Sequence, residues 1–330
     1  MTVYQREGNR LLSQRTILSY TITLVAQAIR RQPTGIHARV DVVVDGVTLA
    51  YSTFNVEKDE DRVRLANSAF KGYSANGLAA DYPATFLKKD LDLFCDGLWE
   101  EQMAVTMPAL TGGSTERHTP VFLLKPYILQ DAGTLLFAAP GMGKSYITML
   151  MAVSLDAGIS TWWPCRSART LFVNLERPRR SVEDRLGNIN EVLGLPRGRE
   201  LRMLHARGRA FTDVNESVER YIQTEGIEAL FLDSISRTAM GDLNENQPAN
   251  RIVDGLNELG IAWLAMAHSP RNDPTHVYGS MHFEAGADIV VRQHAEQEDH
   301  TKPLGISLEI TKANDIPKFP SRILALEFDE

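Results

Sequence analysis

The chain has 330 residues, enough for about two domains of roughly 150 residues each, and its 43% hydrophobic and 23% charged residues are typical of a folded globular protein. The net charge of -7 excludes a uniformly basic nucleic-acid-binding coat, although it leaves room for a local basic loop. No apolar run approaches the ~18 residues that cross a bilayer, no signal-peptide core is present, and the two cysteines, Cys95 and Cys165, indicate neither a disulfide framework nor a zinc site. We therefore expect a cytoplasmic protein that does not enter a membrane.

The first 115 residues carry the pattern of a small α+β domain. Apolar and polar residues alternate on both sides of Asp45-Gly46, a pair that favours the positive φ angles of a two-residue hairpin turn. Helical spacing follows over residues 57–70 and 84–103, and a segment rich in Pro, Gly, Ser and Thr spans residues 107–120. We predict one domain at residues 1–115 and a second at 116–330. The first domain carries no motif, and we expect it to bind a protein partner or DNA, or to support assembly.

The second domain alternates apolar runs with helical stretches. The runs lie at residues 134–139, 170–175, 228–233, 261–268, 287–293, 304–311 and 322–328. Because continuous apolar runs are buried on both faces, they predict an α/β fold with a mostly parallel sheet flanked by helices. The last three runs follow one another without an intervening helical stretch, so we expect them to be antiparallel additions at one edge.

A phosphate-binding loop is predicted directly after the first of these runs. Gly141 and Gly143 permit a tight turn, so that backbone N–H groups and the N-terminus of the following helix point at an anion. Lys144 can reach the β- and γ-phosphates, and the Ser145 hydroxyl can ligate Mg²⁺. The usual pattern begins with Gly where this chain has Ala138, but that residue ends a strand and needs no positive φ. The residues expected to contact nucleotide are Ala139, Pro140, Gly141, Met142, Gly143, Lys144, Ser145 and Tyr146.

Two carboxylates end later apolar runs. Glu176 follows the run at 170–175, where the carboxyl end of a strand faces the γ-phosphate, a position suited to activating water. Asp233 ends the run at 228–233 and is expected to help hold the Mg²⁺ together with Ser145. The sequence has no Asn-Lys-x-Asp guanine-recognition motif, which favours ATP over GTP.

The ordered segments "AAPGMGKS", "LFVNLERP", "ALFLDSISR", "GDLNEN" and "AWLAMAHSPR" resemble the RecA-like ATPases, and among them the RepA-type hexameric helicases and their AAA-labelled phage and plasmid relatives. The resemblance covers about residues 120–330. It implies that Glu176 is catalytic, that Asp233 is the Walker B carboxylate, and that His268 senses the γ-phosphate.

The resemblance also implies an oligomer, a ring such as a hexamer or a filament, in which a neighbour supplies a basic residue to each site. That role falls on Lys312, although Asn314 stands where relatives have Arg, and Lys318 or Arg322 are alternatives. The family's nucleic-acid-facing loops correspond to segments after Asp233 and His268. Their candidate contacts to single-stranded nucleic acid are Arg237, Arg271 and Asn272, but both loops also hold acidic residues and could instead pack between subunits.

The sequence thus predicts a Mg²⁺-dependent, RecA-like oligomeric ATPase coupled to nucleic-acid binding or translocation, of the helicase or recombination type. A regulatory oligomer, whose nucleotide state controls assembly and partner binding without translocation, is an alternative. A small-molecule kinase with residues 177–185 as an arginine-rich lid is another, but the place of that segment directly after Glu176 better fits a helix of the ATPase family.

Overall fold

The computed structural model describes residues 4–7, 10–32, 34–74, 77–104, 108, 110–116, 119–235, 246–270, 273–299 and 302–327. The chain divides into two compact units, Met1–Thr115 and Glu116–Glu330. Within the described ranges, no helix combines the length and apolar character needed to cross a membrane.

The first unit is built on a five-stranded antiparallel sheet. Its strands are β1 (Tyr4–Glu7), β2 (Arg10–Ile17), β3 (Tyr20–Gln32), β4 (Gly35–Val44) and β5 (Val47–Asn55), paired in chain order. The predicted hairpin turn is confirmed, since Asp45 has φ 49° and Gly46 φ 80° between β4 and β5. The sequence did not predict β1 to β3. In β3 a bulge between Gln27 and Arg30 interrupts the alternation of apolar and polar residues.

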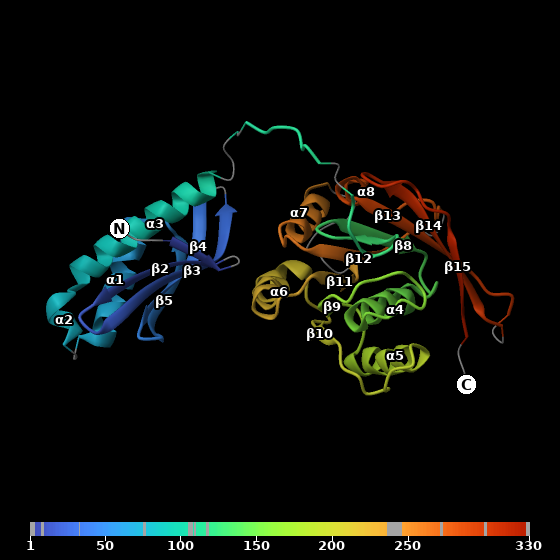
Figure 1. The fold of residues 1–330 in the computed structure, drawn as a ribbon, viewed down its shortest axis with the longest axis horizontal. Coiled ribbons are helices and arrows are strands. Elements are labelled where there is room, and N and C mark those ends of the chain that lie inside the picture. The colour runs from blue at the N-terminus through green and yellow to red at the C-terminus, as the bar shows by residue number, and fades with distance from the viewer. Residues whose placement is uncertain are drawn as a thin grey trace. The chain divides into compact units, whose positions relative to one another are not determined.

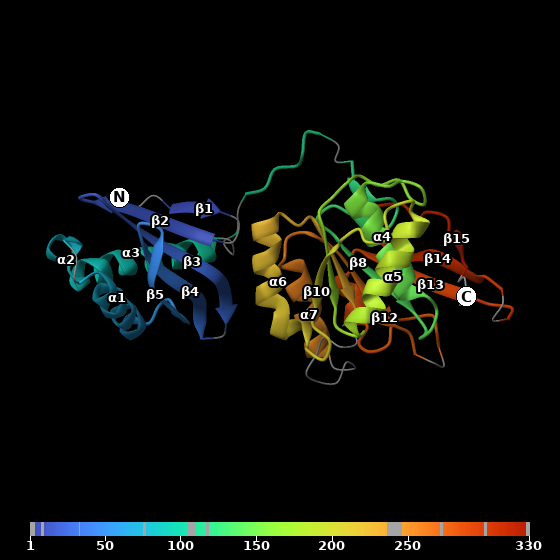
Figure 2. The ribbon, with the colours of Figure 1, turned by 90° about the horizontal axis from the view of Figure 1, so that it is seen from below.

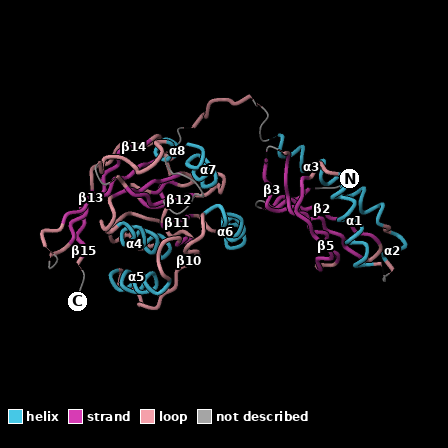
Figure 3. The backbone as a smooth tube through the Cα atoms, turned by 180° about the vertical axis from the view of Figure 1, so that it is seen from behind, coloured by secondary structure: helices cyan, strands magenta, loops and turns pink. Residues whose placement is uncertain are grey.

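Three helices follow this sheet: α1 (Asp59–Tyr73), α2 (Leu78–Asp81) and α3 (Ala84–Ala104). Figure 3 shows α1 and α3 on one face of the sheet. Every second residue of β4 packs with both helices in one hydrophobic core; the β4 members are Ile36, Ala38, Val40, Val42 and Val44. The residues between them therefore belong to the opposite face of the sheet.

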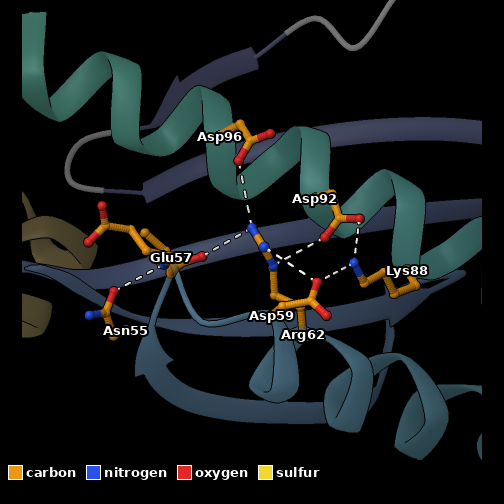
Figure 4. Close-up of polar contacts among 8 residues, drawn as sticks. Asn55, Glu57, Asp59, Arg62, Lys88, Asp92 and Asp96 are labelled. Atoms are coloured by element: carbon orange, nitrogen blue, oxygen red, sulfur yellow. Dashed lines mark hydrogen bonds and ion pairs between the residues drawn. The ribbon is translucent and has the colours of Figure 1, made fainter.

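An ion cluster ties α1 to α3 (Figure 4). The Arg62 guanidinium, only 12% exposed, lies 3.1 Å from Asp92, 3.5 Å from Asp59 and 3.6 Å from Asp96. Lys88 pairs with Asp92 at 2.7 Å and also contacts Asp59. Because two cations lie among three carboxylates, loss of the Arg62 charge leaves the carboxylate of Asp59 on α1 facing those of Asp92 and Asp96 on α3 with one cation between them.

The second unit contains an eight-stranded sheet in the order β10-β9-β11-β12-β8-β13-β14-β15. The strands are β8 (Gly133–Ala138), β9 (Thr170–Asn174), β10 (Arg202–His205), β11 (Ala229–Asp233), β12 (Ala262–His268), β13 (Ile289–Glu296), β14 (Leu304–Ala313) and β15 (Arg322–Leu326), and β6 (Phe122–Leu124) and β7 (Ile128–Leu129) pair separately. The expectation of three antiparallel strands at one edge was wrong for β13, which pairs with β8 in parallel. A parallel strand needs a crossover connection, and α8 (His282–Gly286) lies in it.

Helices cover both faces of this sheet (Figures 1 and 2). On one face α4 (Lys144–Ala157) and α5 (Arg179–Val192) share a core that includes the fully buried Trp163. On the other face α6 (Phe211–Glu225), α7 (Asn246–Asn257) and α8 share a second core. The predicted α/β class with a mostly parallel, helix-flanked sheet is confirmed. The carboxyl ends of β8, β9, β11 and β12 meet at one edge, because His268 pairs with Ala138 and Asp233 with Asn174.

Candidate nucleotide site

The phosphate-binding loop connects β8 to α4 in the conformation that the sequence predicts. Gly141 and Gly143 have φ angles of 82° and 75°, and Ala138, which replaces the usual glycine, ends β8 without a positive φ. A Cβ on Gly143 would come within 3.2 Å of the Leu304 and Ile306 side chains, so the loop runs close to β14. The Gln293 side chain donates a hydrogen bond to the Met142 carbonyl and anchors the loop to β13.

A cavity of about 270 Å³ opens above this loop. Its lining includes six of the residues predicted to contact nucleotide: Gly141, Met142, Gly143, Lys144, Ser145 and Tyr146. Ala139 and Pro140 do not line it, but the Ala139 carbonyl accepts a hydrogen bond from Lys144 at 2.9 Å. Glu176, Asp233 and His268 line the same cavity, so the structure brings together groups from the carboxyl ends of four strands.

Lys144 is buried at the base of the cavity. Its Nζ donates to the carbonyls of Ala138 at 2.7 Å and Ala139 at 2.9 Å. Burial lowers the pKa of the Lys144 ammonium to about 8, although the carboxylates of Glu176 and Asp233 oppose the fall. A phosphate in the cavity would add negative charge beside the ammonium and raise this pKa again.

His268 links the lysine to Glu176. Its Nδ1 lies 3.3 Å from Lys144 Nζ, and its Nε2 lies 4.0 Å from Glu176 Oε2. Burial, followed by the neighbouring ammonium, lowers the pKa of His268, so the imidazole is neutral near pH 7. An ammonium can only donate, and Nδ1 must therefore accept while Nε2 carries the proton toward Glu176. This arrangement suits a side chain that responds to charge in the cavity.

Asp233 and Ser145 form the candidate metal site. Asp233 is 4% exposed and accepts a hydrogen bond from the Ser145 side chain. Burial raises the pKa of Asp233 to about 6, and the nearby Glu176 carboxylate adds to the rise. A carboxylate and a hydroxyl are hard oxygen donors of the kind that Mg²⁺ prefers, and a buried carboxylate gains most from a cation beside it. The two residues therefore fit the predicted Mg²⁺ role together with phosphate oxygens and water.

Glu176 is held by two neighbours at the end of β9. Ser234 donates from its hydroxyl to Glu176 Oε2 at 3.0 Å. The fully buried Asn174 accepts from the backbone N–H groups of Glu176 at 3.3 Å and Arg177 at 2.9 Å. The backbone of Glu176 is thus held in place, and among the described residues its carboxylate accepts one hydrogen bond, which leaves lone pairs for a water molecule in the cavity.

Sequence reasoning missed several residues of this cavity, namely Arg177, Arg185, Ser234, Gln297 and Leu304. Arg177 and Ser234 could have been found, because each directly follows a predicted carboxylate. Arg185 could not, because its place depends on how α5 crosses the loop: its guanidinium lies 4.5 Å from the centre of the Tyr146 ring. Of the segment 177–185 considered as a kinase lid, residues 179–185 form the first half of this helix.

The remaining predicted residues lie elsewhere. Lys312, on β14, does not line the cavity, and its Nζ donates to the carbonyls of Glu284, Ala285 and Ala287 at 2.7–2.9 Å. Its role in a neighbour's site stays a prediction. Arg237, Arg271 and Asn272, the candidate nucleic-acid contacts, lie outside the described residues. Within those residues no group of three or more His, Cys, Asp or Glu side chains is arranged to hold a metal ion.

A phosphate-binding loop at the carboxyl edge of a parallel sheet, with carboxylates from two adjacent strands beside it, defines the class of P-loop nucleotide-binding proteins. A family model described as an AAA domain matches residues 102–274, which is more than half of the 330 residues, so the chain belongs to this family. The family and the fold confirm the predicted resemblance to the RecA-like P-loop ATPases.

Other comparisons are weaker. No curated protein matches the chain. The crystal structure of a KaiC-like protein from the hyperthermophilic archaeon Pyrococcus horikoshii is similar over 63% of this chain and 94% of that chain, with 15% sequence identity and a TM-score of 0.45. A likeness at this level assigns no activity or assembly to the present chain.

Proposed function

We propose that the second unit hydrolyses ATP with Mg²⁺ and that hydrolysis is coupled to single-stranded nucleic acid, as in a helicase or recombination ATPase. The observation that carries the proposal is the position of the Glu176 carboxylate, which shares one cavity with Lys144, Ser145 and Asp233. A kinase would transfer the γ-phosphoryl group to a second substrate. In the proposed reaction the acceptor is water, and the Glu176 carboxylate accepts its proton.

Each residue then has a defined part in the reaction. The loop N–H groups and the Lys144 ammonium bind the phosphates, and Ser145 and Asp233 would hold Mg²⁺, which offsets charge on the β- and γ-phosphates when it is bound. Glu176 accepts a proton from a water molecule while the oxygen of that water forms a bond to the γ-phosphorus. The bond from that phosphorus to the β–γ bridging oxygen breaks, and ADP leaves with the electron pair. His268, between Lys144 and Glu176, registers the loss of the γ-phosphate.

The open face of the first unit's sheet supports the coupling to nucleic acid. On this face, opposite α1 and α3, strand alternation and pairing place Arg10, Arg30, Arg39 and Tyr51. The Arg39 guanidinium lies 4.1 Å from the centre of the Tyr51 ring, and Tyr51 is 62% exposed. Asp41, the carboxylate beside them, already pairs with Arg39 at 2.9 Å. Arginines with an exposed aromatic ring on a sheet suit the phosphates and bases of a single strand.

A homo-oligomer, as a ring or a filament, completes the proposal. Its support is the resemblance to RepA-type helicases, in which the nucleotide lies between subunits.

The test is steady-state ATP hydrolysis with Mg²⁺, with and without single-stranded DNA or RNA. We expect one polymer to stimulate hydrolysis by wild type, and Arg30→Ser with Tyr51→Ser to abolish that stimulation. The matched control, Arg64→Ser with Phe86→Ser, removes one cation and one exposed aromatic from the helical side of the same unit and should keep it. Slow turnover indifferent to either polymer would contradict the coupling and favour the regulatory oligomer.

A further inference from the structure

One role in this site has no residue yet, namely the cation that stabilises the charge building up on the γ-phosphoryl group during transfer. The sequence predicts Lys312 of a neighbour for it, with Asn314 in place of an arginine. In the structure the Lys312 ammonium donates to three backbone carbonyls at 2.7–2.9 Å, and an ammonium has only three N–H groups. Contact with a neighbour's phosphate would require it to give up hydrogen bonds at the end of α8.

Arg177 lies in the cavity of its own chain, next to Glu176. Asn174 fixes its backbone from both sides: Oδ1 accepts from the Arg177 N–H at 2.9 Å, and Nδ2 donates to the Arg177 carbonyl at 2.8 Å. Asn174 is itself fully buried, so its amide has no alternative partner in water. One side chain therefore holds the backbone of both Glu176 and Arg177 at the end of β9.

Among the described residues, the charge of the Arg177 guanidinium is not paired with a carboxylate, and the Nε of this side chain is buried without a hydrogen-bond partner. The two arginines that follow differ from it: Arg179 pairs with Glu183 at 2.7 Å, and Arg180 is exposed outside the cavity. Arg177 is half-buried, so its charge is partly withdrawn from water and would be stabilised by an anion in the cavity. The anion that this cavity would take is a polyphosphate.

We propose that Arg177 supplies, from the same chain as the phosphate-binding loop, the positive charge that stabilises the transferred phosphoryl group. The inference rests on the proposed ATP hydrolysis and names the residue that completes its site. Charge builds up on the γ-phosphoryl oxygens and on the β–γ bridging oxygen as the bond to ADP breaks. Arg177 lines the cavity next to Glu176, the residue that would activate water, so its guanidinium can approach these oxygens. Arg177 makes no covalent bond and transfers no proton.

The first test compares Arg177→Ala with Arg180→Ala, which removes the same charge from the same segment outside the cavity. We expect Arg177→Ala to lower kcat by about 10³-fold or more with little change in ADP affinity, and Arg180→Ala to leave both unchanged. Binding of ADP with aluminium fluoride, which imitates the transferred phosphoryl group, should weaken in Arg177→Ala only. Unchanged kcat and unchanged aluminium fluoride binding in Arg177→Ala would overturn the proposal.

The second test separates a residue that acts in its own chain from one that acts in a neighbour's site. Arg177→Ala and Glu176→Gln chains are each inactive by expectation, and they are mixed under assembly conditions. Because both groups belong to the same site on one chain, mixed oligomers contain no complete site and stay inactive. Recovered hydrolysis would show that Arg177 acts on a neighbour and would overturn the assignment within one chain.

Failure of this proposal is distinguishable from failure of the proposed function. If wild type hydrolyses ATP, Glu176→Gln does not, and Arg177→Ala remains active, the hydrolysis site stands and only the role of Arg177 is wrong. If wild type binds nucleotide without hydrolysing it, the proposed function itself is wrong. ADP binding and the thermal unfolding midpoint of Arg177→Ala show whether the variant is folded.

Discussion

Nucleotide affinity should fall as pH rises through about 8, because the free protein then loses the proton of Lys144. Burial lowers the pKa of this ammonium to about 8 in the free protein. Bound phosphate favours the charged form and raises the pKa, so binding must restore the proton wherever the free lysine has lost it. Nucleotide binding is therefore strongest below the pKa of Lys144 in the free protein. It weakens as pH rises above that value, and it levels off once pH passes the higher pKa of Lys144 in the complex.

The magnitude follows from the titration of one group. With a free pKa of about 8, the protonated fraction falls roughly tenfold between about pH 7 and pH 9, and the dissociation constant of ADP should rise by the same factor. A tenfold change in affinity corresponds to about 1.4 kcal/mol. The terminal phosphate of ADP is fully ionised over most of this range, so its own titration contributes little.

Calorimetric titration with ADP at about pH 8.5, in two buffers with different ionisation enthalpies, measures the protons taken up. We expect uptake of roughly 0.8 proton per site, from the deprotonated fraction of a group with a pKa of about 8. Lys144→Arg is the control, because a guanidinium stays charged at this pH and should remove the uptake in any variant that still binds. No proton uptake, together with constant affinity between about pH 7 and pH 9, would refute the reasoning.

Three further predictions concern other parts of the molecule. The pKa of Asp233 is about 6, and Mg²⁺ binds the ionised carboxylate. The gain in nucleotide affinity that Mg²⁺ produces should therefore shrink by up to about tenfold for each pH unit below about 6. A gain that stays constant down to about pH 5 would contradict this prediction. Gly143→Ala should cost about 1–2 kcal/mol in stability, because φ is 75°, and should also weaken nucleotide binding; an unchanged thermal midpoint and affinity would argue against the described loop. Arg62→Met should lower hydrogen-exchange protection of α1 and α3 by about 1–3 kcal/mol while the exposed Arg64→Met changes it little, and equal effects would dismiss the ion cluster.

The sequence predicted those strands whose residue pattern reflects how deeply they are buried. The apolar runs that became β8, β9, β11 and β12 are continuous because both faces are buried. A polar residue ends β9, β11 and β12 at the edge where nucleotide would bind, and the glycine-rich loop follows β8 there. By contrast β10, an edge strand of four partly buried residues, has no such run. Strand β13 was assigned the wrong direction, because the short α8 in its crossover gives too weak a helical signal.

The sequence predicted those site residues whose type and position next to a strand or turn both indicate the same role. Glu176 and Asp233 stand at strand ends, and Lys144 follows a glycine-rich turn, so residue type and neighbouring sequence point to the same role. The position of Arg185 in the cavity depends on the angle at which α5 crosses Tyr146, and the local sequence does not specify this angle. The hydrogen bonds from Asn174 to the Arg177 backbone depend on the side-chain rotamer of Asn174, which the local sequence does not specify either. Nor could the sequence show that Lys312 already has three backbone acceptors.

Single-turnover hydrolysis of ATP by wild type and Glu176→Gln, with nucleotide binding measured on the same samples, tests the central claim most directly. The substitution keeps the size of the side chain and removes only the charge and the proton-accepting oxygen. We predict that Glu176→Gln binds ATP and Mg²⁺ about as well as wild type but cleaves it at least about 10²-fold more slowly. Equal cleavage by both proteins would contradict the claim that the Glu176 carboxylate activates water in this cavity.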